Sequence, residues 1–133
     1  MSNTSLPQAL CRELGMAALT PDANGACGLH FEDGLQVDLQ FAYAENQLRL
    51  AAYLGQVVPS YRLEIFTAML LGNTFLAEHG LPCVAFETDR ECLALIQTAD
   101  LTGAAAQLAE VVRALAAAAR EARSRLLQEA LLV

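Results

Sequence analysis

The sequence contains no lysine, and its eight arginines are outnumbered by fifteen aspartates and glutamates, which gives a formal net charge of -7. Proteins that bind nucleic acids present a basic surface to the phosphate backbone, and an acidic chain is repelled by anionic membranes. We therefore expect neither a nucleic acid nor a membrane as a partner.

Long apolar runs are missing as well. No stretch reaches the roughly 18 uninterrupted apolar residues that a membrane span requires. The N-terminal sequence MSNTSLPQAL has neither the basic start nor the apolar core of a signal peptide. These absences predict a cytosolic protein.

Signatures of catalysis and of metal binding are also absent. No GxxxxGK[ST], GxGxxG, HExxH or GxSxG motif occurs, and the four cysteines show no CxxC spacing. The two histidines lie in unrelated segments, so they form no recognisable catalytic group. We expect no catalytic residue, no metal and no cofactor, and four free thiols. This residue set favours a binding protein over an enzyme.

The sequence does contain enough apolar residues to form a core. Its 133 residues are 55% hydrophobic, which is enough for one domain spanning residues 1–133. The stretch GACGLHFEDGLQVDLQF, residues 25–41, alternates apolar and polar residues as strands do. A three-residue loop at 32–34, with Gly34 in the left-handed conformation, places Leu29 opposite Val37 and Cys27 opposite Leu39. Cys27 and His30 then point to opposite faces, so the stretch predicts a hairpin and no Cys/His site.

A third strand follows the hairpin, and a second hairpin follows later in the chain. Residues 47–55 alternate again, and a loop at 44–47 would place Tyr43 opposite Leu48 and Phe41 opposite Leu50. The second hairpin covers CVAFE and CLALIQTADL around the polar turn TDR.

Three segments predict helices. The first begins with Ser5 as its cap, and the last runs from TGAAAQL to the C-terminus, where we expect Arg120, Arg123 and Arg125 to form a solvated face that pairs with Glu121 and Glu129. The middle helix, 61–79 with Ser60 as its cap, is apolar on more than one face. A helix of this kind needs burial on two sides, so it predicts a homodimer through this helix and the strand 83–87.

The predicted fold is therefore α+β in the order α-β-β-β-α-β-β-α, with an antiparallel twisted sheet and flanking helices. This order resembles the class I type III secretion chaperones, the family that includes the Tir chaperone. The resemblance rests on five pieces of sequence in the family's order: L..ELG...L, G.C.L.F.DG..V.L, L.L.A.LG, LLGN and CLALIQTADL. The chain departs from the family in having GQVVPS where a shorter Gly-x-Pro connection is usual.

The resemblance implies an ATP-independent homodimer that holds the N-terminal region of a secreted effector in extended form, in the bacterial cytoplasm. The effector-binding surface that we expect combines the first helix with the sheet: Leu10, Leu14, Leu39, Phe41, Leu50 and Tyr53. The expected dimer interface consists of Ile65, Phe66, Met69, Leu70, Asn73, Val84 and Phe86. Asn73 is expected to be exposed or hydrogen-bonded across an interface.

Two alternatives stay open on the residues alone. One is a small α+β enzyme or ligand-binding domain with a pocket between the sheet and the helices. The other is a subunit of a different complex that uses the same faces.

Overall fold

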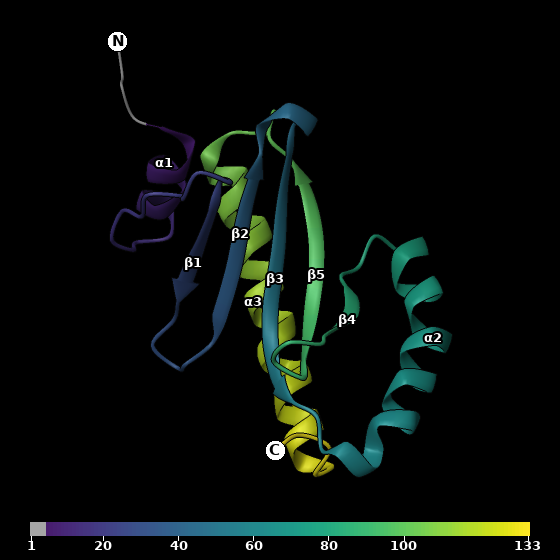
Figure 1. Cartoon of the computed structure of the whole chain (residues 1–133). Helices are drawn as coiled ribbons and strands as arrows, with labels where there is room; N and C mark the ends of the chain where they lie inside the picture. The colour runs from purple at the N-terminus through teal and green to yellow at the C-terminus, as the bar shows by residue number, and fades with distance from the viewer. Residues whose placement is uncertain (1–4) are drawn as a thin grey trace.

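One antiparallel sheet organises the chain, and the computed structural model describes residues 5–133 of it (Figure 1). The strand order in the sheet is β1-β2-β3-β5-β4. The strands are β1 (Ala26–His30), β2 (Gln36–Ala42), β3 (Gln47–Gln56), β4 (Cys83–Glu87) and β5 (Cys92–Asp100). The helices are α1 (Leu6–Glu13), α2 (Arg62–Glu78) and α3 (Ala105–Gln128), and short 3-10 turns cover Tyr43–Glu45 and Pro59–Tyr61. The predicted α+β class and element order are confirmed.

The β1–β2 hairpin has the register that the alternation predicts. Leu29 lies opposite Val37 and Cys27 opposite Leu39, and Gly34 has a φ of +85° in the connecting loop. The predicted register of the next pair is wrong by two residues.

In the β2–β3 pair Phe41 lies opposite Leu48, and Leu39 lies opposite Leu50. The chain leaves β2 at Ala42, because residues 43–45 form a 3-10 turn and Asn46 follows in the left-handed conformation. A shift of two residues keeps every side chain on its face, so alternation alone could not distinguish the two registers.

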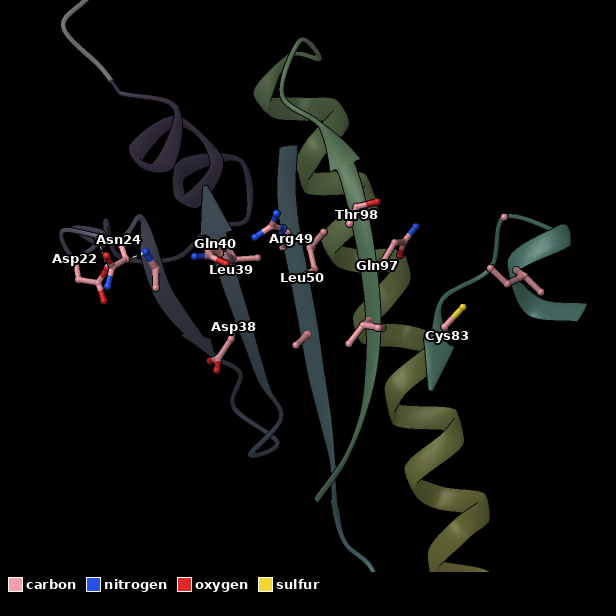
Figure 2. A pocket seen from close by; sticks show the side chains of 15 residues that line it. Asp22, Asn24, Asp38, Leu39, Gln40, Arg49, Leu50, Cys83, Gln97 and Thr98 are labelled. Carbon is pink, nitrogen blue, oxygen red and sulfur yellow. Dashed lines mark hydrogen bonds between the residues drawn. The ribbon is translucent and has the colours of Figure 1, made fainter. Parts of the chain in front are cut away.

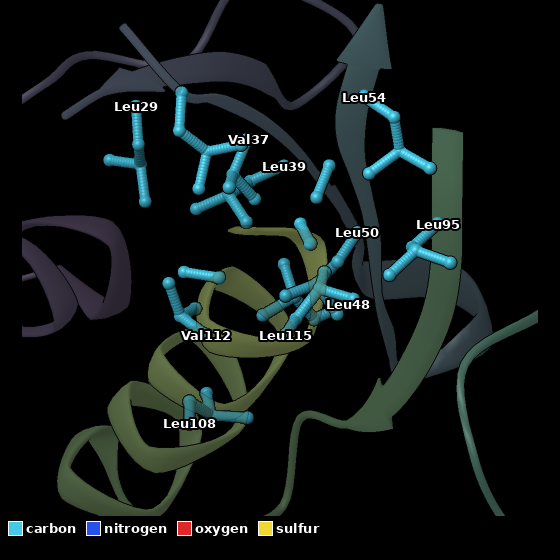
Figure 3. Close-up of a cluster of buried hydrophobic side chains, with 14 of the residues drawn as sticks. Leu29, Val37, Leu39, Leu48, Leu50, Leu54, Leu95, Leu108, Val112 and Leu115 are labelled. Carbon is cyan, nitrogen blue, oxygen red and sulfur yellow. The ribbon is translucent and has the colours of Figure 1, made fainter. Parts of the chain in front are cut away.

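Helix α3 covers one face of the sheet and forms the core with it (Figure 3). Leu108, Val112 and Leu115 of α3 are at most 2% exposed and point towards Val37 and the leucines of β1, β2, β3 and β5. Burial of each such side chain stabilises the fold by about 1.5–3 kcal/mol. Helix α1 lies beside β1 and contacts α3, with Leu10 and Cys11 buried. Ser5 caps α1 as predicted, since its hydroxyl accepts a hydrogen bond from the Gln8 backbone N–H.

An ion pair ties the β1–β2 hairpin to α3. Asp33 in the hairpin loop lies 2.6 Å from Arg120 Nε and 3.7 Å from Arg123 Nη2. The hydrogen bond from Arg120 is the main cause that lowers the pKa of Asp33. Arg125 pairs with Glu121 as predicted. The predicted pairing of Arg120 and Arg123 along their own helix is wrong, because these side chains reach the hairpin instead.

Helix α2 lies beyond β4, at the edge of the sheet, and has few contacts with the rest of the chain (Figure 1). Ser60 does not cap it, because Ser60 belongs to the preceding 3-10 turn and Tyr61 stands at the N-cap without a side-chain bond. Among residues 5–133, no helix has the length and apolar composition to cross a membrane.

The last residues leave the helix, contrary to the prediction that it continues to the end of the sequence. Ala130 has a φ of 58°, and the chain then forms an isolated antiparallel bridge between Leu132 and Val57. The Val58 backbone N–H donates to Leu131 O at 2.9 Å, and the Val133 N–H donates to Gln56 O at 2.8 Å. Residues 130–133 therefore hold the GQVVPS connection from which α2 begins.

We expect Leu132→Ala to lower the free energy of unfolding by about 2 kcal/mol, since the Leu132 side chain is 7% exposed and packs against Gly55. Val133→Ala is the matched control, because that side chain is 77% exposed and its backbone bond is kept. Urea denaturation at one protein concentration measures both. Equal losses in the two variants would contradict the role of the bridge.

Candidate protein-binding surfaces

The free edge of β1 carries unpaired backbone groups. Phe31 N–H donates to Leu35 O, and Phe41 N–H donates to Gly25 O. Hydrogen-bonded pairs alternate along an antiparallel ladder, so the odd-numbered residues of β1 form the hydrogen-bonded pairs with β2. Gly28 and His30 consequently direct their backbone N–H and C=O groups away from the sheet. Ala26, at the start of the edge, is bonded to Asp22 through both its N–H and its C=O. The open part of the edge is therefore Gly28–His30.

The other edge of the sheet, on β4, is covered by α2. The Asn73 side-chain amide donates to Val84 O at 2.9 Å, and its oxygen accepts from the Val84 N–H at 2.9 Å. One amide thus occupies both edge groups of Val84, as a strand residue would. The two expectations for Asn73, exposure or a hydrogen bond across an interface, resolve here into hydrogen bonds within the chain.

The face of the sheet opposite α3 is open, and no helix of the described residues covers it (Figure 2). A shallow groove of about 810 Å³ runs across it from the loop before β1 to the α2–β4 connection. Polar side chains of β2, β3 and β5 point into this groove: Asp38, Gln40, Arg49 and Thr98. Apolar atoms make up most of the groove's exposed lining, and these polar side chains stand among them.

Asp38 is the central charged group of this face near β1. Its carboxylate accepts a hydrogen bond from Gln36 Nε2 at 2.7 Å. Burial is the main cause that raises the pKa of Tyr53, and the nearby Asp38 carboxylate raises it further. The guanidinium of Arg90 lies 4.8 Å from the centre of the Tyr53 ring. Tyr53 is half-buried and is held by neighbours on the open face.

Helix α2 presents an apolar surface to solvent. Leu63 is 76% exposed, Leu70 is 81% exposed and Leu71 is 78% exposed. Phe75, one turn further along, is also exposed. These residues share one broad side of the helix, because their spacing of four, seven and eight residues brings them together. Exposed apolar surface of this kind marks an interaction site.

The opposite side of α2 packs against β4. Phe66 and Phe86 meet edge to face, with ring centres 5.0 Å apart. Arg62, at the start of the helix, pairs with Glu91 at 2.7 Å. A second groove, of about 440 Å³, separates α2 from the C-terminal half of α3, and apolar side chains make up most of its lining. Contacts at the β4 side and at the base therefore fix the position of α2.

Most of the predicted effector-binding side chains lie in the core. Leu10 is fully buried, and Leu39, Phe41 and Leu50 are each 2% exposed. Their expected accessibility is wrong, because α1 and α3 cover the face to which these side chains point. Leu14 and Tyr53 are partly exposed, so they are accessible to a partner.

The predicted dimer residues divide between the two sides of α2. Ile65 is buried, and Phe66, Met69, Asn73, Val84 and Phe86 are half-buried at the junction of α2 with β4. Leu70 alone among them is fully on the solvent side. Sequence reasoning missed the exposed residues Leu63, Leu71 and Phe75, because a helix that is apolar all round gives no period from which to assign its faces.

The hairpin pattern correctly predicts that Cys27 and His30 take opposite faces of the sheet. Cys27 belongs to the core face, and His30 is exposed on the other face. All four cysteines are free, and burial is the main cause that raises the pKa of the Cys27 thiol. Residues 5–133 contain no group of three or more His, Cys, Asp or Glu side chains that could hold a metal ion.

Comparison with known proteins places the chain in a family. Residues 6–123 match the Tir chaperone protein (CesT) family, so the match covers most of the sequence. The chain belongs to this family. No curated protein sequence matches it.

Solved structures with the same fold include chaperone complexes. The HopA1–SchA chaperone–effector complex has a TM-score of 0.72 at 18% identity, covering 90% of this chain and 91% of the other. The ExsC–ExsE complex has a TM-score of 0.70 at 16% identity, covering 91% and 87%. The Yersinia pestis type III secretion chaperone SycH, in complex with a fragment of YscM2, has a TM-score of 0.66 at 20% identity, covering 90% and 98%.

We expect Asn73→Ala to lower the free energy of unfolding by about 1–3 kcal/mol, because it leaves the edge groups of Val84 without their partner. Thr74→Ala is the matched control, since Thr74 is the next residue of α2 and is exposed. Urea denaturation at a fixed protein concentration compares the two. A loss no larger than that of the control would show that the amide does not hold α2 on β4.

Proposed function

We propose that this protein is a type III secretion chaperone, built as one domain over residues 1–133, which works in the bacterial cytoplasm. It binds the N-terminal region of a secreted effector in extended form, keeps it soluble and ready for secretion, and uses neither ATP nor catalysis. The observation that carries the proposal is the unpaired β1 edge, beside an open sheet face, in a chain of the Tir chaperone protein family. The chaperone–effector complex of the same fold supports it.

An extended chain can bind here by adding a strand to the sheet. Gly28 and His30 offer two N–H and two C=O groups at one edge, and an incoming backbone satisfies them. Alternate side chains of the incoming strand then face the open groove and the α1 side of the sheet. Backbone bonds give affinity without requiring the effector to fold, which suits a partner that must remain unfolded for secretion.

We also propose that the active form is a homodimer through α2 and β4. The exposed side of α2 carries Leu63, Leu70, Leu71 and Phe75, and Leu81 of the following loop is 48% exposed. Burial of this surface against a second copy removes a large apolar area from water. A stable interface of this kind buries about 2,000 Å² or more. The β1 edge lies at the other end of the sheet, so dimerisation leaves it free.

We expect Leu70→Glu to dissociate the dimer while each chain stays folded. Leu70 is 81% exposed in the single chain, so the carboxylate is tolerated there, whereas in the dimer it would be buried without a partner. Light scattering at micromolar concentration measures the mass, and circular dichroism checks the helical content. Leu127→Glu on α3 is the control, because Leu127 is 51% exposed and lies on a different helix.

A wild-type chain that is monomeric at micromolar concentration would refute this interface. So would a Leu70→Glu variant that keeps the mass of the wild type. Substitutions at Met69 or Phe86 are poorer probes, since these side chains already pack within the chain and their loss would damage the fold.

We expect His30→Pro to weaken effector binding about tenfold or more, because it removes an edge N–H and places a ring where the incoming strand would lie. The His30 N–H faces away from β2, so the sheet itself keeps its bonds. His30→Thr is the control, since it removes the imidazole and keeps the N–H. Binding is measured by titration with purified N-terminal fragments of secreted effectors, and equal affinity of the two variants would contradict strand addition at this edge.

The function itself is tested by mixing the protein with such fragments in the absence of nucleotide. Gel filtration with light scattering should find a complex of two chaperone chains with one effector fragment. If no fragment binds while a small molecule stabilises the protein or is turned over by it, the proposal fails and the ligand-binding or enzyme alternative replaces it.

A further inference from the structure

A small polar notch lies on the open face at the free edge of β1. Gly28 has no side chain, and a Cβ at this position would lie 3.3 Å from Asp38 Oδ1. The same point is 3.7 Å from His30 Nε2 and 3.8 Å from Gln36 Nε2. Three polar side chains therefore surround the space above Gly28, and the Asp38 carboxylate comes closest to it.

The Asp38 carboxylate has no cationic partner among residues 5–133. The arginines of the open face are engaged elsewhere, since Arg49 pairs with Glu45 and Arg90 lies over the Tyr53 ring. The groups that do face Asp38 are the Gln36 amide, the Tyr53 hydroxyl and, across the space above Gly28, the His30 imidazole. Its negative charge is therefore available to a cation that enters the notch.

An added strand would place a side chain at the mouth of this notch. Gly28 directs its N–H and C=O outward, so one residue of an antiparallel incoming strand exchanges both hydrogen bonds with it. Neighbouring strands lie about 4.8 Å apart, and residues directly opposite each other point to the same face. The side chain opposite Gly28 therefore projects over the open face and can cross the bare Gly28 backbone to the Asp38 carboxylate.

We propose that the notch formed by Gly28, His30, Gln36 and Asp38 binds a lysine or arginine side chain of the effector strand. This inference rests on the proposed function, and it specifies the partner. The partner is an extended segment with a basic residue opposite Gly28, flanked on each side by apolar residues that face the Cys27 and Phe31 side of the sheet. Asp38 supplies the charge, and Gly28 supplies the space.

The test is a selection from a random twelve-residue peptide library displayed on phage, with the purified dimer as bait. The wild-type protein should enrich peptides that alternate apolar and polar residues and carry Lys or Arg at one fixed alternate position. Asp38→Lys should shift that position to Asp or Glu, because the charge of the notch is reversed. Wild-type peptides without a basic preference would overturn the inference and leave the proposed function intact, whereas no enriched peptide at all would overturn both.

A second measurement covers the case in which Asp38→Lys does not fold. An enriched peptide and its Lys→Met version are titrated against the wild type and against Asp38→Asn, which has nearly the same shape. Asp38→Asn should weaken the Lys peptide about tenfold and leave the Met peptide unchanged, since a hydrogen bond to a charged group is stronger than a neutral one. Asp89→Asn, in the exposed β4–β5 turn, is the control for the change of charge.

Equal losses for both peptides would assign Asp38 a purely structural role beside Gln36 and Tyr53, and would overturn the inference. Gly28→Val should also weaken the Lys peptide, because its side chain fills the notch. Circular dichroism and light scattering on each variant confirm that the dimer is intact.

Discussion

The packing of α3 on one face of the sheet is the contact on which the rest of the structure depends. It buries apolar side chains, mostly leucines, of four strands, and it leaves the other face without a cover. A sheet with one buried and one solvated face must alternate apolar and polar residues, which is the pattern of β2. The same packing decides where a partner can bind. The buried face is inaccessible, so a partner can reach only the open face and the edges of the sheet.

The two edges of this sheet are treated differently. Asn73 satisfies the edge groups of Val84 in β4 through one side-chain amide, so α2 blocks further pairing at that residue. The edge of β1 keeps unpaired groups at Gly28 and His30, which is a liability in a protein that does not use them. The sheet thus has an open edge at β1 and an edge blocked at Val84 of β4. This difference is consistent with a sheet that accepts a strand at one defined place.

Sequence alternation predicted which face each strand residue takes, and the order of elements predicted the fold. The alternation could not predict the β2–β3 register, because a shift of two residues leaves Phe41 and Leu50 on the same face. It also could not tell which face is covered, so buried residues such as Leu39 were expected to bind a partner. The notch at Gly28 depends on three side chains from two strands, and only their placement in space brings them together.

The position of α2 links the end of the chain to assembly. Its exposed leucines form a usable interface only if the helix is held at a fixed angle, and its own contacts with β4 are few. The bridge between Leu132 and Val57 lies within the GQVVPS connection that precedes the helix. It holds this connection in place, so the start of α2 is fixed. Loss of this bridge should therefore affect both the core, to which Leu132 belongs, and the position of α2. The orientation of α2 is thus set from both ends, by Asn73 on β4 and by residues 130–133 at the base.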